Sequence, residues 1–350
     1  MIKKKNTIKD IARMAGVSKG TVDRVLHKRG KVSKTALAKV EKILKEIDFH
    51  PNPIARNLKE NKVYKICVLI PDDKIDVYWT PAHEGIYEAQ KEFIAFGLVV
   101  EKFLYHPHNK QDFHKKSMEA IKVKPDLLLM TPLFEQESFQ ISQTCKEEKI
   151  RVALFNNHLN TKTTQSFIGQ DLVQSGKIAA NLIDKILPSE SDIGIIHIDK
   201  EPHLLLKEQG FKEYYINQEC SHRILDAKDF NSDNQDRFKH DVKQYIRNNP
   251  NVAALFITNS KVYMIAEILS KLPKSCVLVG YDLVPKNVSY LKEGKLDFLI
   301  HQRPKEQAYL SINYFAEFFL FGKNVPLKNL LPIDIITAQN VDYYLNQSSN

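Results

Sequence analysis

From residue 63 onward, continuous apolar runs alternate with amphipathic stretches, and this alternation restricts the fold more than any other feature of the chain. The apolar runs predict strands at 65–70, 98–103, 126–131, 152–156, 193–198, 254–259 and 277–282. Between them, stretches such as 84–93 and 175–187 carry apolar residues at helical spacing. Strands that are apolar on both faces and separated by helices indicate parallel sheets with helices on both sides. We therefore expect an α/β fold for most of the chain.

The first 62 residues have a different composition from the rest. They hold 17 Lys and Arg against 6 Asp and Glu, a net charge of +11, whereas the remaining residues hold 34 against 36, a net of −2. A small basic module joined to a nearly neutral one predicts a polyanionic partner for the small module only. The alternative is a solvated lysine-rich tail, which the regular apolar pattern of this stretch argues against.

Two short helices are predicted at the start of the basic module. Thr7 can cap the first helix and Gly16 can end it in a left-handed conformation, and Ser18 can cap the second. The expected inward positions are Ile8, Ile11, Ala12 and Ala15 in the first helix, and Val22, Val25 and Leu26 in the second. Two short helices joined around a glycine form a helix-turn-helix.

The outward face of the second helix and a third helix complete this module. Outward positions near the N-terminus of a recognition helix meet base edges in the major groove; here they are Lys19, Gly20, Thr21, Asp23 and Arg24. A third helix is predicted after a cap at Ser33, and its apolar positions are Ala36, Leu37, Val40, Ile43, Leu44 and Ile47. A three-helix bundle without a nucleic-acid partner is the alternative, and the charge argues against it.

The first 60 residues resemble the lactose/galactose-repressor family of bacterial transcription regulators. The segments T-I-K-D-I-A-R-M-A-G-V-S-K-G-T-V-D-R-V-L, V-S-K-T and F-H-P-N-P-I-A-R-N-L carry the likeness. The resemblance implies a hinge helix that orders on DNA and inserts one leucine per subunit into the minor groove as an apolar wedge. The DNA-binding residues predicted for the helix-turn-helix are Thr7, Ser18, Lys19, Gly20, Thr21, Arg24 and Ser33, and the resemblance adds the hinge residues Asn52, Ala55 and Leu58. Asp23 and Gly20 depart from the family pattern, so the preferred operator should differ from those of its best-known members.

Polar and aromatic residues follow the predicted strands of the large module. Ligands of parallel α/β sheets bind beyond the carboxyl ends of the strands. The residues found there are Tyr78, Trp79, Asn156, Asn157, Asn259, Asp282 and Gln302. Amides and a carboxylate beside aromatic rings suit a neutral polyhydroxylated ligand, since polar groups bond hydroxyls and rings cover the apolar sugar face. For each residue singly, a turn or helix cap is the alternative.

This module is similar to periplasmic sugar-binding proteins of the ribose type, through I-G-Q-D-L-V-Q-S-G-K-I-A-A, F-I-T-N-S, V-G-Y-D and L-K-E-G-K-L-D-F-L-I-H-Q. The likeness implies two Rossmann-like subdomains linked by three crossovers, near 160, 300 and 326, with the ligand between them. It places ligand contacts at Asn156, Asn259, Asp282 and Gln302. Lys207 stands where the family has an arginine, and lysine lacks the planar fork of that residue; Asn156 stands where an aspartate is common.

These patterns together predict an N-terminal all-α helix-turn-helix domain and an α/β periplasmic-binding-protein-like effector domain. The expected boundaries are 1–50 for the helix-turn-helix domain, 51–62 for the hinge, 63–160 plus 302–325 for one effector subdomain, and 161–301 plus 326–345 for the other. The effector-binding residues predicted are Tyr78, Trp79, Asn156, Asn157, Lys207, Asn259, Asp282 and Gln302.

Catalytic motifs are not evident. The stretch G-Q-D-L-V-Q-S-G-K fails the spacing of a phosphate loop, and G-x-S-x-G, H-E-x-x-H and G-x-G-x-x-G do not occur. Four scattered cysteines fit a reducing compartment, and no run approaches the ~20 apolar residues of a membrane span. The histidine-containing segment 105–108, with His114, is interpreted as a solvated loop rather than a metal site. No metal, cofactor or secretory leader is expected.

The resulting interpretation is a cytoplasmic transcription regulator, a repressor and not an enzyme, that binds double-stranded operator DNA as a homodimer or dimer of dimers. A small carbohydrate or sugar derivative is the expected effector, and Lys207 leaves a sugar phosphate or sugar acid open. Two alternatives stay open: a corepressor-dependent or activating regulator, and a sugar-metabolising enzyme with a DNA-binding head.

Overall fold

The computed structural model divides the chain into two compact units, Met1–Asn61 and Lys62–Asn350. It describes residues 7–26, 29–47, 49, 62–159, 166–188, 190–216, 222–273 and 275–347. The predicted hinge residues Asn52, Ala55 and Leu58 lie outside the described residues. The first unit is called the head and the second the effector module.

The head contains the three predicted helices. These are α1 (Ile8–Ala15), α2 (Lys19–Leu26) and α3 (Lys34–Glu46). Thr7 and Asp10 form a reciprocal capping box at the start of α1, Gly16 ends α1 with φ 63°, and the Ser33 hydroxyl caps α3. The fully packed residues of the head are Ile11, Ala12, Ala15, Val22 and Val40.

One core position of the head was predicted wrongly. Leu37, expected inside, is 36% exposed. The residues of α3 and its C-cap that belong to the core cluster or pack against it are Val40, Ile43, Leu44 and Ile47, all nearer its C-terminal end. The core of the head therefore centres on Val40, one turn further along α3.

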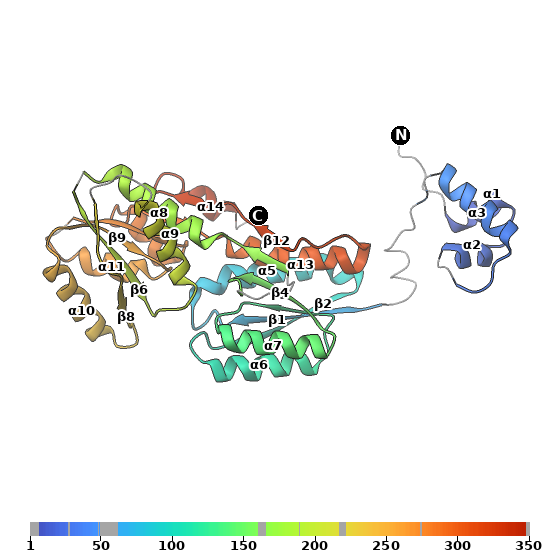
Figure 1. Ribbon diagram of the computed structural model, residues 1–350, viewed down its shortest axis with the longest axis horizontal. Helices are drawn as coiled ribbons and strands as arrows, with labels where there is room; N and C mark the ends of the chain where they lie inside the picture. The colour runs from blue at the N-terminus through green and yellow to red at the C-terminus, as the bar shows by residue number, and fades with distance from the viewer. Residues whose placement is uncertain are drawn as a thin grey trace. The chain divides into compact units, whose positions relative to one another are not determined.

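The effector module has two lobes, each built on a sheet. The sheet of lobe 1 has the order β12-β5-β4-β3-β1-β2 and every pair is parallel. Its strands are β1 (Tyr64–Pro71), β2 (Leu98–Tyr105), β3 (Leu127–Met130), β4 (Arg151–Asn156), β5 (Ser166–Gly169) and β12 (Lys328–Leu330). Helices cover both faces, α5 and α13 on one and α6 and α7 on the other (Figure 1). Their bounds are α5 (Thr80–Phe93), α6 (Lys110–Lys122), α7 (Glu135–Glu147) and α13 (Pro304–Phe321).

The sheet of lobe 2 has the order β13-β11-β10-β9-β6-β7, and β8 also pairs with β6. Only β13 among these described strands is antiparallel to its neighbour. The strands are β6 (Asp192–Ile198), β7 (Arg223–Ile224), β8 (Lys228–Phe230), β9 (Val252–Ile257), β10 (Val277–Tyr281), β11 (Phe298–His301) and β13 (Asp334–Ile336).

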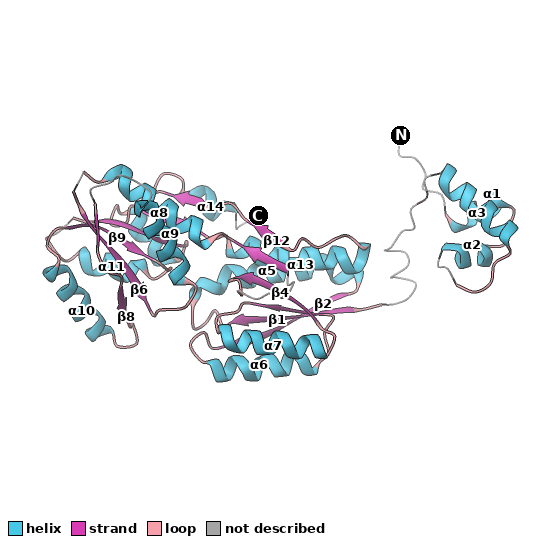
Figure 2. Cartoon of the chain, viewed as in Figure 1, coloured by secondary structure: helices cyan, strands magenta, loops and turns pink. Residues whose placement is uncertain are grey.

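Helices also cover both faces of lobe 2 (Figure 2). One apolar cluster joins the sheet to α8 (Leu172–Ile186) and α9 (Leu204–Ile216). A second cluster, on the other face, joins it to α10 (Gln235–Asn248), α11 (Val262–Leu269), α12 (Pro285–Lys292) and α14 (Val341–Gln347). The strands that the sequence predicts are all present. Those inside the sheets, such as β1, β6, β9 and β10, are buried on both faces, whereas β2 at a sheet edge is partly exposed.

The lobe boundaries differ from the expected ones by several residues. β5 and β12 belong to the sheet of lobe 1, so the crossovers lie between β5 and α8, between β11 and α13, and between β12 and β13. The first and third therefore come about ten and five residues later than predicted, because strands of four and three residues are too short to recognise by periodicity. No helix among the described residues is long and apolar enough to cross a membrane.

Candidate functional site

A cavity lies between the two lobes at the carboxyl ends of their strands. It contains about 530 Å³ of space not filled by atoms, part of it open to solvent. All eight effector-binding residues predicted from the sequence line it: Tyr78, Trp79, Asn156, Asn157, Lys207, Asn259, Asp282 and Gln302. The structure thus brings together side chains that lie up to 224 residues apart in the sequence.

Two of these residues occupy a strained backbone conformation at the end of a strand. Asn156 has φ 69° and Asp282 has φ 65°, in the left-handed region that side chains other than glycine rarely adopt. Asn287 stabilises the second bend, because its Nδ2 donates to the carbonyl oxygens of Tyr281 and Asp282 at 2.9 and 3.0 Å. Turns of this kind end β4 and β10 at the cavity wall, so the polar side chains of Asn156 and Asp282 lie there.

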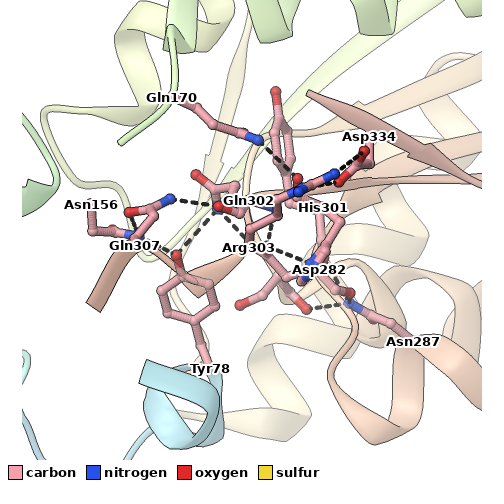
Figure 3. Close-up of polar contacts among 12 residues, drawn as sticks. Tyr78, Asn156, Gln170, Asp282, Asn287, His301, Gln302, Arg303, Gln307 and Asp334 are labelled. Atoms are coloured by element: carbon pink, nitrogen blue, oxygen red, sulfur yellow. Dashed lines mark hydrogen bonds and ion pairs between the residues drawn. The ribbon is translucent and has the colours of Figure 1, made fainter. Parts of the chain in front are cut away.

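A chain of hydrogen bonds runs across the cavity from lobe 1 to lobe 2 (Figure 3). Asn156 Nδ2 donates to the Tyr78 hydroxyl at 2.5 Å, and Gln302 Nε2 lies 3.5 Å from the same hydroxyl. Gln302 also donates to both carboxylate oxygens of Asp282, from Nε2 at 2.7 Å and from its backbone N–H at 3.1 Å. The chain joins elements of both lobes, so a ligand bound here contacts groups that move when the lobes move.

Lys207 is buried beside this chain. Its side chain comes from α9, and the residue is 1% exposed. Nζ donates to the Thr258 carbonyl at 3.0 Å and lies 3.6 Å from the centroid of the Tyr281 ring. Burial lowers the pKa of Lys207, and the carboxylates of Asp282 and Glu201 oppose this shift. Burial likewise raises the pKa of Asp282, opposed chiefly by Lys207.

Two glycines allow α9 to lie directly against α8 and so fix Lys207. A Cβ at Gly210 would lie 1.8 Å from the Val173 carbonyl oxygen, and one at Gly176 would lie 2.0 Å from the Lys207 carbonyl oxygen. Atoms that are not bonded to each other cannot approach so closely, so only glycine permits this packing. The glycine in the K-E-Q-G-F stretch is therefore a packing residue that positions the lysine three residues earlier.

The cavity also contains residues that the sequence analysis did not select. They are Asp76, His108, Leu133, Ile198, Asp199, Glu201, His203, Leu204, Ser260 and Lys261. The interpretation of 105–108 as a solvated loop is wrong for Tyr105, whereas His108 is exposed to solvent in a turn. Tyr105 is fully buried and its hydroxyl donates to the Thr131 carbonyl at 2.8 Å, whereas His108 lines the cavity. A search a few residues beyond each strand end would have included Asp76 and Glu201.

The three crossovers are tied together behind the cavity. Gln170 Nε2 donates to the carbonyl of His301 at 3.0 Å and also to that of Pro332. Arg303, in the left-handed conformation with φ 55°, forms two hydrogen bonds with Asp334 (Figure 3). A few residues at element ends are the usual hinges of domain closure, and these contacts fix their resting arrangement.

The head presents the predicted DNA-facing side chains on its surface. Lys19, Gly20 and Arg24 of α2 are exposed, and Thr21 is half-buried. Thr7, Ser18 and Ser33 are exposed at helix starts, where each accepts a hydrogen bond from a backbone N–H. Their contact with DNA stays a prediction. Among the described residues, no group of three His, Cys, Asp or Glu side chains is placed to hold a metal ion.

A helix-turn-helix head and a two-lobed domain with a polar cavity together define a ligand-responsive DNA-binding regulator. Comparison with known proteins agrees: residues 66–322 match the periplasmic binding protein domain, and residues 7–52 match the bacterial regulatory proteins of the lacI family. The chain belongs to the lacI family of transcription regulators, with an effector module of the periplasmic-binding-protein type.

Several relatives share most of their length with this chain. It is 25% identical over 258 residues to the HTH-type transcriptional regulator MalR of Streptococcus pneumoniae, covering 73% of this chain and 76% of that protein. It is 26% identical over 293 residues to the ribose operon repressor of Halalkalibacterium halodurans, covering 80% and 81%. A solved structure from Bacteroides fragilis, assigned to the LacI transcriptional regulators, has a TM-score of 0.75 and 28% identity, with 81% of this chain and 100% of that chain covered.

Proposed function

We propose that this protein represses transcription from an operator and that a small sugar-like effector, bound between the lobes, changes its operator affinity. The observation that carries the proposal is the cavity itself. Four amides converge there with Asp282 and two aromatic rings, contributed by both lobes. Amides donate and accept hydrogen bonds, as sugar hydroxyls do, and the rings of Tyr78 and Trp79 can cover an apolar sugar face.

The relative position of the two lobes can couple effector binding to operator affinity. A ligand that bonds to Asn156 of lobe 1 and Asp282 of lobe 2 favours one relative position of the lobes. If the operator-binding form favours another position, ligand and operator change each other's affinity by the same factor, commonly 1–3 kcal/mol. The crossover contacts of Gln170 and Arg303 are the points at which the lobes would rotate.

The assembly that fits this mechanism is a homodimer or a dimer of dimers in the cytoplasm, where the chromosome lies. One short recognition helix reads a half-site, and two-fold pairing of heads matches a palindromic operator. The hinge segment 51–62 would link each head to its effector module, with Leu58 as the minor-groove wedge.

The proposal is tested with the full-length protein and a random duplex library. Repeated selection should yield a palindromic site, and fluorescence anisotropy should show its release when a binding sugar is added. Failure to enrich any sequence would contradict sequence-specific binding. Tighter DNA binding in the presence of the sugar would replace induction by corepression, and release only by purines or amino acids would exclude a sugar effector.

A further inference from the structure

We propose that the effector carries a basic nitrogen, as an amino sugar does, and that its ammonium group binds between Asp76 of lobe 1 and Glu201 of lobe 2. This inference rests on the proposed function, because it assigns a ligand class to the same cavity. It also closes an option left open by the sequence, in which Lys207 was free to receive an anionic group.

The first support is the charge of the cavity wall. The carboxylates that line it are Asp76, Asp199, Glu201 and Asp282, and the ammonium groups are Lys207 and Lys261. The formal balance of these described residues is thus −2 when all four carboxylates are ionised, the form that a bound cation favours. The cavity histidines do not offset it, because burial lowers the pKa of His203 to about 3 and also lowers the pKa of His108. The negative charge of the cavity wall would therefore repel a phosphate or carboxylate group of a ligand.

Both cavity lysines are already engaged by the protein. Lys261 Nζ lies 2.5 Å from a carboxylate oxygen of Asp199. Lys207 donates to the Thr258 carbonyl and lies over the Tyr281 ring, and the carboxylates of Asp282 and Glu201 act on it from the cavity side. An anion beside Lys207 would therefore also meet these two carboxylates, so the lysine compensates buried negative charge and is not an open anion site.

Asp76 and Glu201 are left without a lysine partner of their own. Asp76 lies just before the short helix Val77–Trp79 and accepts a hydrogen bond from the Tyr78 backbone at 3.1 Å. Glu201 follows β6, and Nδ1 of the His203 ring lies 3.3 Å from its carboxylate. Burial and then the repulsion from Asp76 raise the pKa of Glu201 to about 7, and the ammonium groups of Lys261 and Lys207 oppose this shift; both carboxylates line the same cavity. A cation between them would relieve this repulsion.

Two further features of the same wall indicate a polar ligand of this class. Asn157 is 3% exposed, lines the cavity, and its Nδ2 has no hydrogen-bond partner, so it offers a donor to a hydroxyl oxygen. The rings of Tyr78 and Trp79 pack edge to face, 4.9 Å between centroids, and both line the cavity. Aromatic faces attract cations as well as the C–H face of a sugar.

The test uses calorimetric titration of the full-length protein with matched sugar sets. Each set contains a neutral hexose (glucose, galactose or mannose), its 2-amino and 6-amino derivatives, and its 6-phosphate. In the set that binds, we expect an amino member to bind at least tenfold more tightly than the neutral parent, and the phosphate at least tenfold more weakly. Glu201→Gln and Asp76→Asn should each lower the ratio of amino-sugar affinity to neutral-sugar affinity at least fivefold.

Glu293→Gln is the matched control, since it removes the same charge from an exposed site outside the cavity wall. Equal or tighter binding of the neutral parent, or tightest binding of the phosphate, overturns the inference and leaves the sugar proposal standing. An amine preference that survives both cavity variants, each confirmed as folded by its thermal midpoint, overturns the Asp76–Glu201 site. Absence of binding by every member of every set overturns the sugar proposal and this inference together.

Discussion

The head and the effector module build their functional surfaces in opposite ways. In the head, each feature comes from residues within one or two helical turns: the capping box of Thr7 and Asp10, the left-handed Gly16, and the exposed face of α2. In the module, the cavity needs strand ends that lie far apart in the sequence, such as Tyr78 and Gln302. Local sequence is therefore sufficient to interpret the head, whereas the module depends on its topology.

Charge follows the same division. The first 62 residues carry +11 and the remainder −2, and the cavity wall itself is negative by two. A polyanion is attracted to the head by a general field, which falls with salt. The effector module selects its ligand at a buried site, where single pairings count for more because water screens them less. The same chain thus uses long-range attraction for DNA and short-range matching for the effector.

The largest effect is expected when a closely packed glycine of the effector module is replaced, because this lowers the free energy of unfolding of that unit. Gly210→Ala should destabilise the effector module by about 3 kcal/mol, because its Cβ would overlap the Val173 carbonyl and force α9 away from α8. Trp79 is the single tryptophan of the chain and lies in the module, so its fluorescence during urea unfolding measures this unit. The same variant should weaken effector binding, since α9 carries Lys207. An unchanged midpoint would show that α9 can shift at no cost and that the packing argument is wrong.

The second prediction concerns sequence preference in the head. Arg24→Ala should reduce discrimination between operator and random DNA by roughly 10- to 100-fold, the value of one bidentate contact to guanine at about 1–3 kcal/mol. Binding to random DNA should persist and keep its salt dependence. Lys39→Ala removes the same charge from the exposed face of α3 and should weaken binding to both DNAs alike. If the two variants behave identically in anisotropy titrations, Arg24 contributes charge but not specificity.

The third prediction tests the cavity. Asp282→Ala removes the acceptor of both Gln302 bonds and leaves ligand and protein donors unpaired, at roughly 1–3 kcal/mol. Effector affinity should fall at least severalfold in calorimetric titration, and operator binding without effector should survive. Asp342→Ala, at an exposed position of α14, provides the control for loss of one carboxylate. Full effector affinity in Asp282→Ala would remove this residue from the site.

The head was predicted from the sequence more completely than the effector module. Every predicted cap of the head is present, and the one error, Leu37, concerns which turn of α3 meets the core, which periodicity does not report. In the module, long apolar strands were predicted and short ones such as β5 and β12 were not, so the crossovers were placed too early.

Only part of the cavity wall was predicted from the sequence. Residues immediately after strands were identified because the carboxyl ends of parallel strands share one edge. Asp76 and Glu201 also lie in loops that follow strands, but no spacing distinguishes a carboxylate that faces the cavity from a solvated one, and the charge of the wall emerged only when the two lobes were placed together.

The smallest expected effect is the counterpart of the first, a glycine replaced where there is room. Gly20 lies in α2, and a Cβ there would meet nothing closer than Ser18 Oγ at 3.8 Å and Arg24 Nη2 at 3.9 Å. Alanine loses less backbone entropy than glycine on entering a helix, so Gly20→Ala should stabilise the head by roughly 0.5–1 kcal/mol. Far-ultraviolet circular dichroism should show a higher midpoint for the head, while the Trp79 transition stays where it is. A lower midpoint for the head would mean that α2 requires glycine at this position. The space around Gly20 would then not distinguish it from the closely packed Gly210.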